Sequence, residues 1–417
     1  MRLLVLVAGL FLMCSRMSAI DADLRVRLQR SIDSVQKAER IQGVSAAVMI
    51  GGEVWQGAAG LSYAGRPMTA EMVLGIGSNT KTCTAITLLR LQEQGLIDLD
   101  TQIGRWFPQQ PSIDGAITVR QLLNHTSGLG DYSLQRYRDS TLADLSRIWK
   151  PRELLSFIPE KQFDAGNSWS YCNTNYLLAG IIAEEVSGQP LMQLFRRELF
   201  DPLSLDSVRL FPDEPVMGEL AHRWMGGRDA SSNPMNGEWS GAWAAGAVMA
   251  TAAEMVQFYD ALFRGAILTE ASMSELLAFG GPNSYGLGIS EKRVGGERIV
   301  GHSGEIRGYS SVIFWIPSLR ASIAVLTNSI PSNPIAVAAG IVRELQSSLS
   351  SVFDTTSESS VLLLPCDVFR LDGSSAGRIV SSAELQTFSS GIYLLCNESW
   401  SRLVYVSPNG KVYNHIY

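Results

Sequence analysis

Two side chains at the start of an expected helix have the types and spacing of a nucleophile and its base. Ser78 and Lys81 lie three residues apart in the run GIGSNTKT at positions 75–82, and side chains at this spacing share one face of a helix. A hydroxyl becomes an effective nucleophile when a neighbouring base takes its proton, and an amine can do so. The helix N-terminus also favours developing negative charge. The S-x-x-K pattern therefore predicts acyl-transfer chemistry at Ser78, although a serine at such a place is by itself more commonly a helix cap.

The same run partly matches a phosphate-binding loop, G-x-x-x-x-G-K-[ST]. Thr80 stands where that loop requires its second glycine, at the point where the backbone must approach the phosphate closely. This mismatch excludes the phosphate-binding interpretation.

Two further tripeptides could complete a site. They are Tyr171-Cys172-Asn173, a Y-x-N pattern, and His302-Ser303-Gly304, an H-x-G pattern. In isolation, a tyrosine is usually a packed aromatic residue and an asparagine a turn residue. Their order after S-x-x-K favours one shared active site instead.

Together, these three motifs resemble those of class C β-lactamases and D-alanyl-D-alanine carboxypeptidases. The runs LLNHTSGL at 122–129 and YLLAGII at 176–182 agree with this resemblance, which covers about Val44 to Asn328. The chain is thereby identified as a member of the penicillin-recognising serine hydrolases. The resemblance implies a β-lactamase/transpeptidase-like α+β fold, in which helices flank an antiparallel sheet and a second subdomain is mainly helical.

The resemblance also implies a role for each matching residue. Ser78 would attack the substrate carbonyl and become acylated, while Lys81 and Tyr171 would move the proton, with a tyrosinate favoured by the nearby amine. Both stay candidates for the general base. Substrate would be bound by Asn173, which would hold its amide carbonyl, and by His302, Ser303 and Gly304. The oxyanion hole would be formed by the backbone N–H groups of Ser78 and Glu305.

One position departs from the β-lactamase pattern. His302 stands where β-lactamases usually have a lysine, whereas H-x-G is more typical of carboxypeptidases, D-aminopeptidases and esterases. A lysine is a fixed cation, but a histidine titrates near neutral pH. We therefore expect carboxylate binding that depends on pH, and a D-alanyl-D-alanine carboxypeptidase-like peptidase or an esterase.

Two alternatives stay open. One is a class C-like β-lactamase, and the other, from a different class, is a non-catalytic penicillin- or peptidoglycan-binding protein. Because all the reactive positions are present, the sequence favours an enzyme. Its substrate would be a peptidoglycan stem peptide, another D-amino-acid peptide, an ester or a β-lactam.

Charge and histidine content argue against other functions. The formal net charge is −6 and no run of Lys and Arg forms a basic stripe, so nucleic acid is not an expected partner. The four histidines have no paired spacing, so neither a metal site nor a cofactor is expected. His125 is expected to shape the fold near the pocket. Trp239 and Trp243 would either flank the pocket or pack in the core.

The elements that must position these residues follow from hydrophobic periodicity and turn residues. Two apolar runs joined at Gly51-Gly52 predict a hairpin over 44–59. A helix is expected from Thr80 to Gln94, closed by Gly95. Further helices are expected at Leu177–Val186, Leu191–Leu199, Ala252–Phe263 and Pro334–Leu345, and strands at Arg298–Val300, Ser310–Ile316 and Ser322–Thr327. Strands around a helical middle predict an α+β domain whose sheet joins both ends of the sequence.

Composition then divides the chain. A hydrolase domain is expected over 20–345, a Ser/Thr-rich linker over 346–360 and a small β-rich module over 361–417. The strands expected in the module are Val361–Leu364, Cys366–Arg370, Ile392–Leu395 and Leu403–Val406. Cys366 and Cys396 could pair there, whereas Cys83 and Cys172 are expected to be buried.

Residues 1–19 have the features of a signal peptide. Arg2 supplies a positive charge, the apolar run from Leu3 to Met13 is too short to span a bilayer, and Ser18-Ala19 supplies small residues for cleavage. Cys14 raises a lipoprotein alternative, which the bulky Met13 before it opposes. We expect a secreted or periplasmic protein. A short resemblance of the C-terminal module to bacterial sorting domains adds association with the cell envelope as an alternative.

Overall fold

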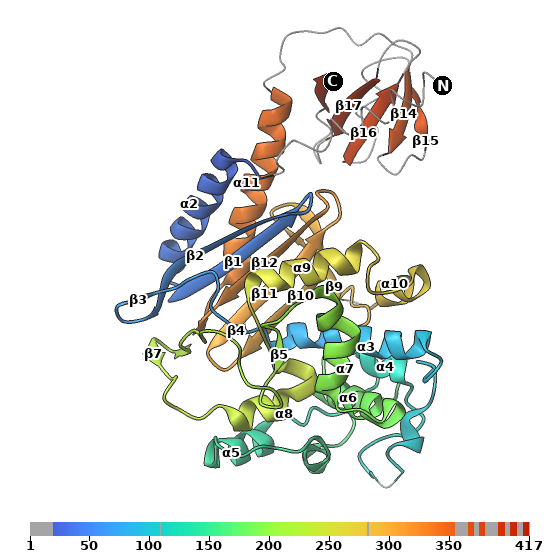
Figure 1. Ribbon diagram of the computed structural model, residues 1–417. Coiled ribbons are helices and arrows are strands. Elements are labelled where there is room, and N and C mark those ends of the chain that lie inside the picture. Colours follow the sequence, from blue (N-terminus) through green and yellow to red (C-terminus); the bar gives the residue numbers. More distant parts are fainter. Residues whose placement is uncertain are drawn as a thin grey trace.

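The computed structural model describes residues 20–108, 110–281 and 283–354, together with five strands between 366 and 416. The predicted signal peptide over 1–19 and the strand predicted at Val361–Leu364 lie outside the described residues. The described part has the α+β fold that the sequence predicts: helices cover both faces of a large antiparallel sheet, and a mainly helical region lies below it in Figure 1.

The central sheet joins the two ends of the hydrolase sequence, as predicted. Its strands lie in the order β3-β2-β1-β12-β11-β10-β9, with antiparallel neighbours throughout. Val44 of β1 lies opposite Thr327 of β12. The strands are β1 (Gly43–Ile50), β2 (Glu53–Tyr63), β3 (Arg66–Pro67), β9 (Ser290–Val294), β10 (Glu297–Ile306), β11 (Tyr309–Ile316) and β12 (Ala321–Thr327).

Two glycines form the turn of the first hairpin. Gly51 and Gly52 have φ values of 60° and 84°, the combination required by a two-residue type I′ turn and adopted by glycine without steric cost. The predicted hairpin is therefore confirmed, although β2 continues to Tyr63.

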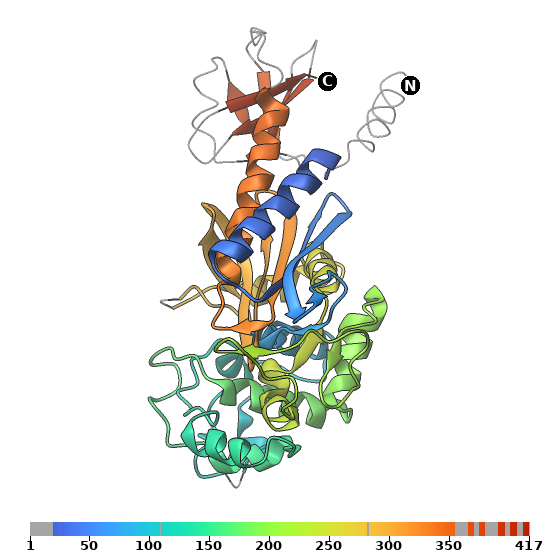
Figure 2. The same cartoon turned by 90° about the vertical axis from the view of Figure 1, so that its left-hand side faces the viewer.

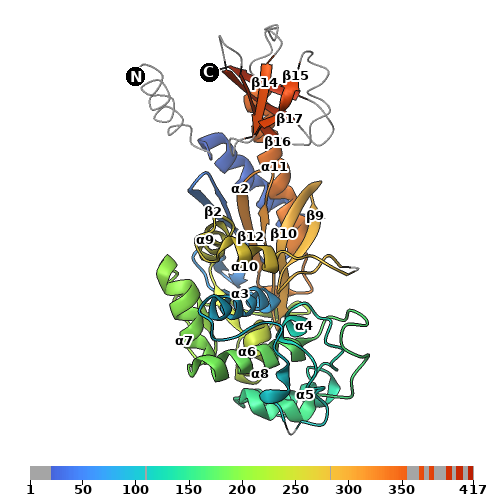
Figure 3. The same ribbon diagram turned by 90° about the vertical axis from the view of Figure 1, so that its right-hand side faces the viewer.

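The two faces of the sheet contribute to two separate cores. Helices α2 (Ala22–Ala38) and α11 (Pro334–Asp354) lie side by side on one face (Figure 2), whereas α9 (Ala252–Phe263) covers the other (Figure 3). Successive residues of β1, such as Ala46 and Ala47, belong to different cores, because side chains alternate along a strand.

The helical region contains the elements that carry the first two motifs. Helix α3 (Thr80–Glu93) ends before Gly95, as predicted, and is buried along nearly its whole length. Helix α6 (Asn173–Ser187) begins four residues before the predicted start, so the Y-x-N motif leads directly into it. The other α-helices are α4 (Val119–Leu123), α5 (Gln135–Ala143), α7 (Leu191–Phe195), α8 (Asn236–Gly246) and α10 (Glu270–Leu276).

Short strands connect this region to the main sheet. One small sheet has the order β4-β8-β5 and another the order β13-β6-β7. Their strands are β4 (Leu74–Gly75), β5 (Arg209–Leu210), β6 (Trp224–Met225), β7 (Arg228–Asp229), β8 (Val248–Ala250) and β13 (Ser329–Ile330). Because β4 ends just before Ser78, this pairing helps to place the first motif beside the main sheet.

One helix was not predicted from the sequence, and two predicted helices have different bounds in the structure. Helix α2 was missed because its buried stripe is narrow and consists only of Leu24, Leu28 and Ile32. Helix α11 continues to Asp354, well into the predicted linker over 346–360, because serines inside a helix cost little once the helix has formed. The helix predicted at Leu191–Leu199 changes after Phe195 into a π-helical turn (Arg196–Phe200).

A five-stranded sheet follows α11. Its order is β15-β14-β16-β17-β18, with strands β14 (Cys366–Arg370), β15 (Ser375–Ile379), β16 (Gly391–Cys396), β17 (Ser401–Val406) and β18 (Val412–Ile416). The division into module and linker stays a prediction, as does pairing of Cys366 with Cys396, whose side chains lie outside the described part. Cys83 and Cys172 are buried and free, as expected. Among the described residues, no helix has the length and apolar character to cross a membrane.

Candidate active site

A short turn and one buried helix carry the first motif. Ser78 lies in a 3-10 turn (Gly77–Asn79) that leads into α3, and Lys81 follows one turn later. The Nζ atom of Lys81 lies 3.1 Å from Oγ of Ser78. The structure thus brings together the two residues singled out by the S-x-x-K spacing, with Ser78 partly accessible and Lys81 fully buried.

The side-chain nitrogen of Lys81 is surrounded by acceptors. Besides Ser78 Oγ, it donates to Oδ1 of Asn173 at 2.8 Å and to the carbonyl oxygen of Ala245 at 2.7 Å. Three acceptors match the three protons of an ammonium group. Burial lowers the pKa of Lys81 to about 7, while the carboxylate of Asp131 opposes this shift. Near neutral pH, Lys81 therefore exists both as an amine and as an ammonium.

A strained turn near the end of α8 supplies one of these acceptors. Trp243 has φ 34° and ψ −118°, a conformation that non-glycine residues rarely adopt, and two residues later the carbonyl of Ala245 faces Lys81. The Trp243 indole packs so closely on α6 that a Cβ on Gly180 would lie 2.7 Å from it. Both Trp243 and Trp239 are buried, so of the two predicted roles the structure supports core packing.

Tyr171 has a buried phenol beside Ser78. The Lys81 nitrogen lies 4.9 Å from the centre of the Tyr171 ring, and the phenol oxygen has no partner with full hydrogen-bond geometry. Burial raises the pKa of Tyr171, and the nearby Ser78 hydroxyl lowers it by less. The expected tyrosinate is therefore wrong: the phenol keeps its proton at neutral pH.

Asn173 is committed to contacts within the protein. Its Oδ1 accepts from Lys81, and its Nδ2 donates to Oδ2 of Asp131 at 3.2 Å and to Oγ of Ser133 at 3.1 Å. Since a side-chain amide has only two N–H donors, binding of a substrate carbonyl by this NH2 group, as expected from the sequence, would have to displace Asp131 or Ser133.

The segment 125–133 holds the start of α6 in place. Nδ1 of His125 accepts from the backbone N–H of Cys172 at 3.2 Å and faces the side-chain amide of Asn175 at 3.0 Å. Oγ1 of Thr174 donates to the carbonyl of Gly130 at 2.7 Å. These contacts satisfy polar groups at a helix terminus. They give the buried His125 the structural position expected for it.

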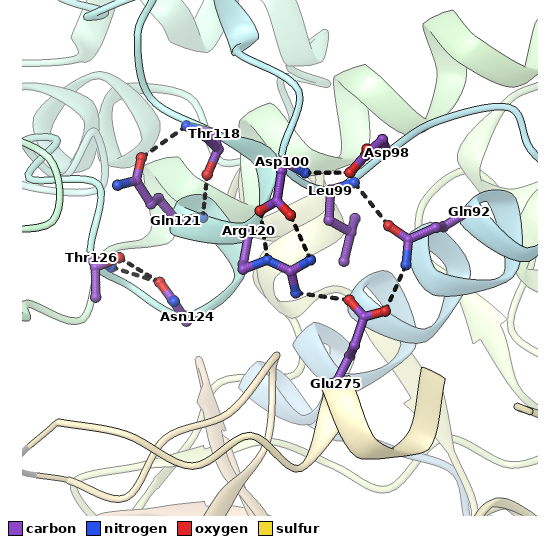
Figure 4. Close-up of polar contacts among 10 residues, drawn as sticks. All are labelled: Gln92, Asp98, Leu99, Asp100, Thr118, Arg120, Gln121, Asn124, Thr126 and Glu275. Carbon is purple, nitrogen blue, oxygen red and sulfur yellow. Dashed lines mark hydrogen bonds and ion pairs between the residues drawn. The ribbon is translucent and has the colours of Figure 1, made fainter. Parts of the chain in front are cut away.

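An ion-pair network anchors the helix that precedes this segment (Figure 4). Arg120 of α4 pairs with Asp100 at 2.7 Å and with Glu275 of α10 at 2.8 Å, and Gln92 of α3 donates to Glu275 at 3.0 Å. The partners are partly exposed, so each pair contributes little to stability. Their geometry nevertheless connects α3, α4 and α10 just before His125.

The third motif lies inside β10, which packs directly on the 3-10 turn Gly77–Asn79 (the nucleophile turn), so named for the candidate nucleophile Ser78. A Cβ on Gly304 would lie 1.9 Å from the carbonyl oxygen of Ile76. Gly77 has φ +52°, and a Cβ there would lie 2.5 Å from the backbone nitrogen of Glu305. Both positions therefore require glycine. Their close approach brings the backbone of Glu305 beside the residue that precedes Ser78.

His302 is buried and electrically neutral. Its Nδ1 contacts the carbonyl oxygen of Ser303, which can only accept, so Nδ1 carries the proton and Nε2 accepts from the hydroxyl of Tyr285 at 2.9 Å. Burial, together with the charge of Lys81, lowers the pKa of His302 to about 3. The expectation that His302 titrates near neutral pH was wrong, because the sequence does not reveal its burial.

A cleft of about 540 Å³ opens beside Ser78, and Tyr171, Tyr285, His302, Ser303 and Glu305 are among its lining residues. Its two charged lining residues, Lys292 and Glu305, are exposed, and no ion pair joins either of them to another described residue. Among the residues that the structure describes, no cluster of three His, Cys, Asp or Glu side chains could hold a metal ion.

Sequence reasoning missed three groups at this site. Ala245 contributes a backbone carbonyl, which leaves no side-chain signature. Asp131 and Tyr285 lie outside the three motifs, and only tertiary contacts reveal their partners. The sole sequence signal was the position of Asp131 two residues after the end of the HTSGL run at 125–129.

The match to a known family extends over most of the chain. The family model described as Beta-lactamase matches residues 28–347. The chain is 27% identical to a D-aminopeptidase of Cereibacter sphaeroides, over 72% of this chain and 59% of that protein. It is 28% identical to penicillin-binding protein 4 of Amycolatopsis lactamdurans, over 55% and 61%. The chain thus spans about three fifths of the length of these relatives.

A solved structure agrees with the fold. The D-amino acid amidase of Ochrobactrum anthropi SV3 is 28% identical in sequence, with a TM-score of 0.70 over 79% of this chain and 100% of that chain. The predicted β-lactamase-like α+β fold is therefore confirmed.

Replacement of Gly304 by alanine should separate β10 from the nucleophile turn. Because the new Cβ would overlap the carbonyl of Ile76, we expect a loss of about 1–3 kcal/mol in the free energy of unfolding, measured by urea denaturation. Gly280→Ala is the matched control, since no atom lies within 4 Å of its Cβ position. Equal stability of the two variants would contradict the close packing.

Proposed function

The chain belongs to the Beta-lactamase family of serine hydrolases, and we propose that it is an exported enzyme that forms an acyl-enzyme at Ser78. The observation that carries this proposal is the 3.1 Å contact between Ser78 and a buried lysine whose pKa is near 7. Such an amine can hold or release a proton at the pH of the reaction, as a general base requires. Export is supported by the signal-peptide features of residues 1–19.

In acylation, Lys81 acts as the base. Its neutral amine takes the proton of Ser78 as Oγ bonds to the substrate carbonyl carbon. The backbone N–H groups of Ser78 and Glu305 stabilise the oxyanion, where a single donor is worth about 10²–10³ in rate. Tyr171 gives its phenol proton to the leaving group, and the proton held by Lys81 then restores the phenol. In deacylation, the Tyr171 phenol passes its proton to Lys81 and the phenolate takes a proton from the water that attacks the ester carbonyl. The ammonium of Lys81 then gives its proton to Oγ of Ser78 as the bond between the acyl carbon and Oγ breaks.

We propose that the acyl donor is a D-amino acid amide, an amino-terminal D-residue of a peptide or a simple ester. Neutral His302 offers no cation for a substrate carboxylate, which D-alanyl-D-alanine peptides and β-lactams both carry. Glu305 offers a carboxylate to a free amino group at the cleft. The names of the D-aminopeptidase and D-amino acid amidase relatives agree with this choice.

A second candidate is a D-alanyl-D-alanine carboxypeptidase. Lys292 lines the cleft and is exposed, so it could replace His302 as the cation that binds a terminal carboxylate. In either case, we propose that residues 20–345 are the catalytic unit and that the strands after 361 form an accessory module.

Substrate comparison with a Ser78→Ala control tests the proposed function. We expect D-alanine amide to be hydrolysed with a kcat/KM at least tenfold above those of L-alanine amide and a chromogenic cephalosporin, and Ser78→Ala to abolish both turnover and acylation. Intact-mass analysis after a fluorescent penicillin or a fluorophosphonate would detect the adduct, and mass analysis of its peptides would locate it. Fast cephalosporin turnover, or an adduct on another residue, would overturn the proposal.

The pH dependence of kcat/KM should follow Lys81. Since the neutral amine is the base and its pKa is about 7, we expect kcat/KM for a neutral ester to rise from pH 6 to pH 8 and then to level off. Titration of His302 adds no further pH dependence of kcat/KM in this range, because its pKa is about 3. Activity that falls as the pH rises through 7 would show instead that the ammonium form of Lys81 is required.

A further inference from the structure

Asp131 accepts four hydrogen bonds from two parts of the active-site framework. Its Oδ1 accepts from the backbone N–H and the hydroxyl of Ser133, at 2.8 and 2.7 Å. Its Oδ2 accepts from the backbone N–H and the side-chain Nδ2 of Asn173, at 3.0 and 3.2 Å. Only an ionised carboxylate presents acceptors alone on both oxygens. An asparagine of the same shape would leave two of these four donors without an acceptor.

These contacts determine which way the amide of Asn173 faces. With Nδ2 on Asp131, Oδ1 must face Lys81, where it accepts a hydrogen bond at 2.8 Å. The reverse orientation would set the amide oxygen against a carboxylate and the amide N–H groups against an ammonium. Asp131 therefore selects the rotamer of Asn173 that Lys81 requires.

Asp131 also has the largest effect among the groups that raise the pKa of Lys81. Besides Asp131, the titratable side chains that face Lys81 are Tyr171 and Tyr176, whose rings it contacts, and His125, His302 and Cys172. Burial keeps both tyrosines protonated and both histidines neutral, and it raises the pKa of the Cys172 thiol to about 12. Of the two groups that raise the pKa of Lys81, the Cys172 thiol is therefore uncharged, which leaves the carboxylate of Asp131 with its four hydrogen-bond donors.

We propose that Asp131 is a positioning residue of this active site, which orients Asn173 toward Lys81 and balances the charge of the ammonium group. The inference rests on the proposed role of Lys81 as the base. Asp131 acts through Asn173 and does not line the cleft. It also accepts from the first N–H of α6, where the N-cap residue Cys172 supplies no side-chain bond, so a purely structural capping role must be distinguished.

The test is the rate at which a fluorophosphonate labels Ser78, measured by intact mass across pH 5 to 9. This readout requires the nucleophile and base but no assumption about the natural substrate. For Asp131→Asn, we expect the plateau rate at high pH to fall by about 10²-fold, the usual effect of a misplaced catalytic group. We also expect the rising part of the plot of labelling rate against pH (the limb) to move to lower pH, because removal of a negative charge lowers the pKa of Lys81.

Two further variants separate charge from geometry. Asp131→Glu keeps the charge but moves the carboxylate, so the plateau should fall while the limb stays near pH 7. Ser133→Ala removes one acceptor of Asn173 and keeps Asp131, so the plateau should fall by about two- to tenfold with no shift of the limb. If Asp131→Asn does not fold, Asp131→Glu decides the question, because a displaced carboxylate that leaves the plateau unchanged would contradict the positioning role.

Asp144→Asn is the matched control. Asp144 makes the same turn, accepting from the backbone N–H and hydroxyl of Ser146 at 3.0 and 2.6 Å, but it is exposed on the surface. We expect its labelling rate and limb to match those of the unmodified enzyme.

The outcomes separate failure of the inference from failure of the proposed function. If the unmodified enzyme is not labelled at Ser78, the proposed function is wrong. If it is labelled, but Asp131→Asn only lowers Tm and leaves the plateau and limb unchanged, Asp131 is a helix cap and the inference is overturned. An unchanged plateau in a folded Asp131→Glu variant would also contradict it.

Discussion

The burial of one amine constrains the whole arrangement. A buried ammonium without partners costs several kcal/mol, so the fold must bring acceptors to Lys81 from three separate places. They come from the turn before α3, the start of α6 and the end of α8, at Ser78, Asn173 and Ala245. Burial also lowers the pKa of Lys81 to about 7. The same constraint that requires these elements to converge thus makes the amine a usable base.

Each of these elements is in turn held by contacts that contribute nothing to the chemistry directly. The segment 125–133 satisfies the start of α6 through His125, Gly130 and Asp131. The Trp243 turn stores backbone strain that packing on α6 compensates. Close glycine contacts bring β10 against the nucleophile turn. The candidate active site is therefore a junction between the sheet and the helical region, and neither part would form it alone.

The sequence predicted the parts of this site that depend on residue type and local spacing. Ser78, Lys81, Tyr171, Asn173 and His302 were all found from three short motifs, and the bounds of α9 were predicted correctly. Local patterns suffice there because helical spacing alone brings Ser78 and Lys81 together.

What the sequence could not predict depends on burial and on the backbone. Tyr171 stays protonated and His302 stays neutral because tertiary packing removes water from both. The Ala245 carbonyl has no residue signature. Asp131 is distant in sequence from Asn173 and becomes its partner only in the folded chain. Helix α2 was not predicted because its buried apolar stripe is narrow. The continuation of α11 to Asp354 was not predicted because the sequence there is rich in serine.

The protonation state of Lys81 tests this account most directly. In enzyme labelled with 13C at the lysine Cε positions, NMR titration would follow each amine separately, with Lys81→Arg used to assign its signal. We predict that the Lys81 signal titrates near pH 7. A Lys81 signal that titrates near 10 would contradict the account, because the amine would then be protonated throughout the reaction and could not act as the base.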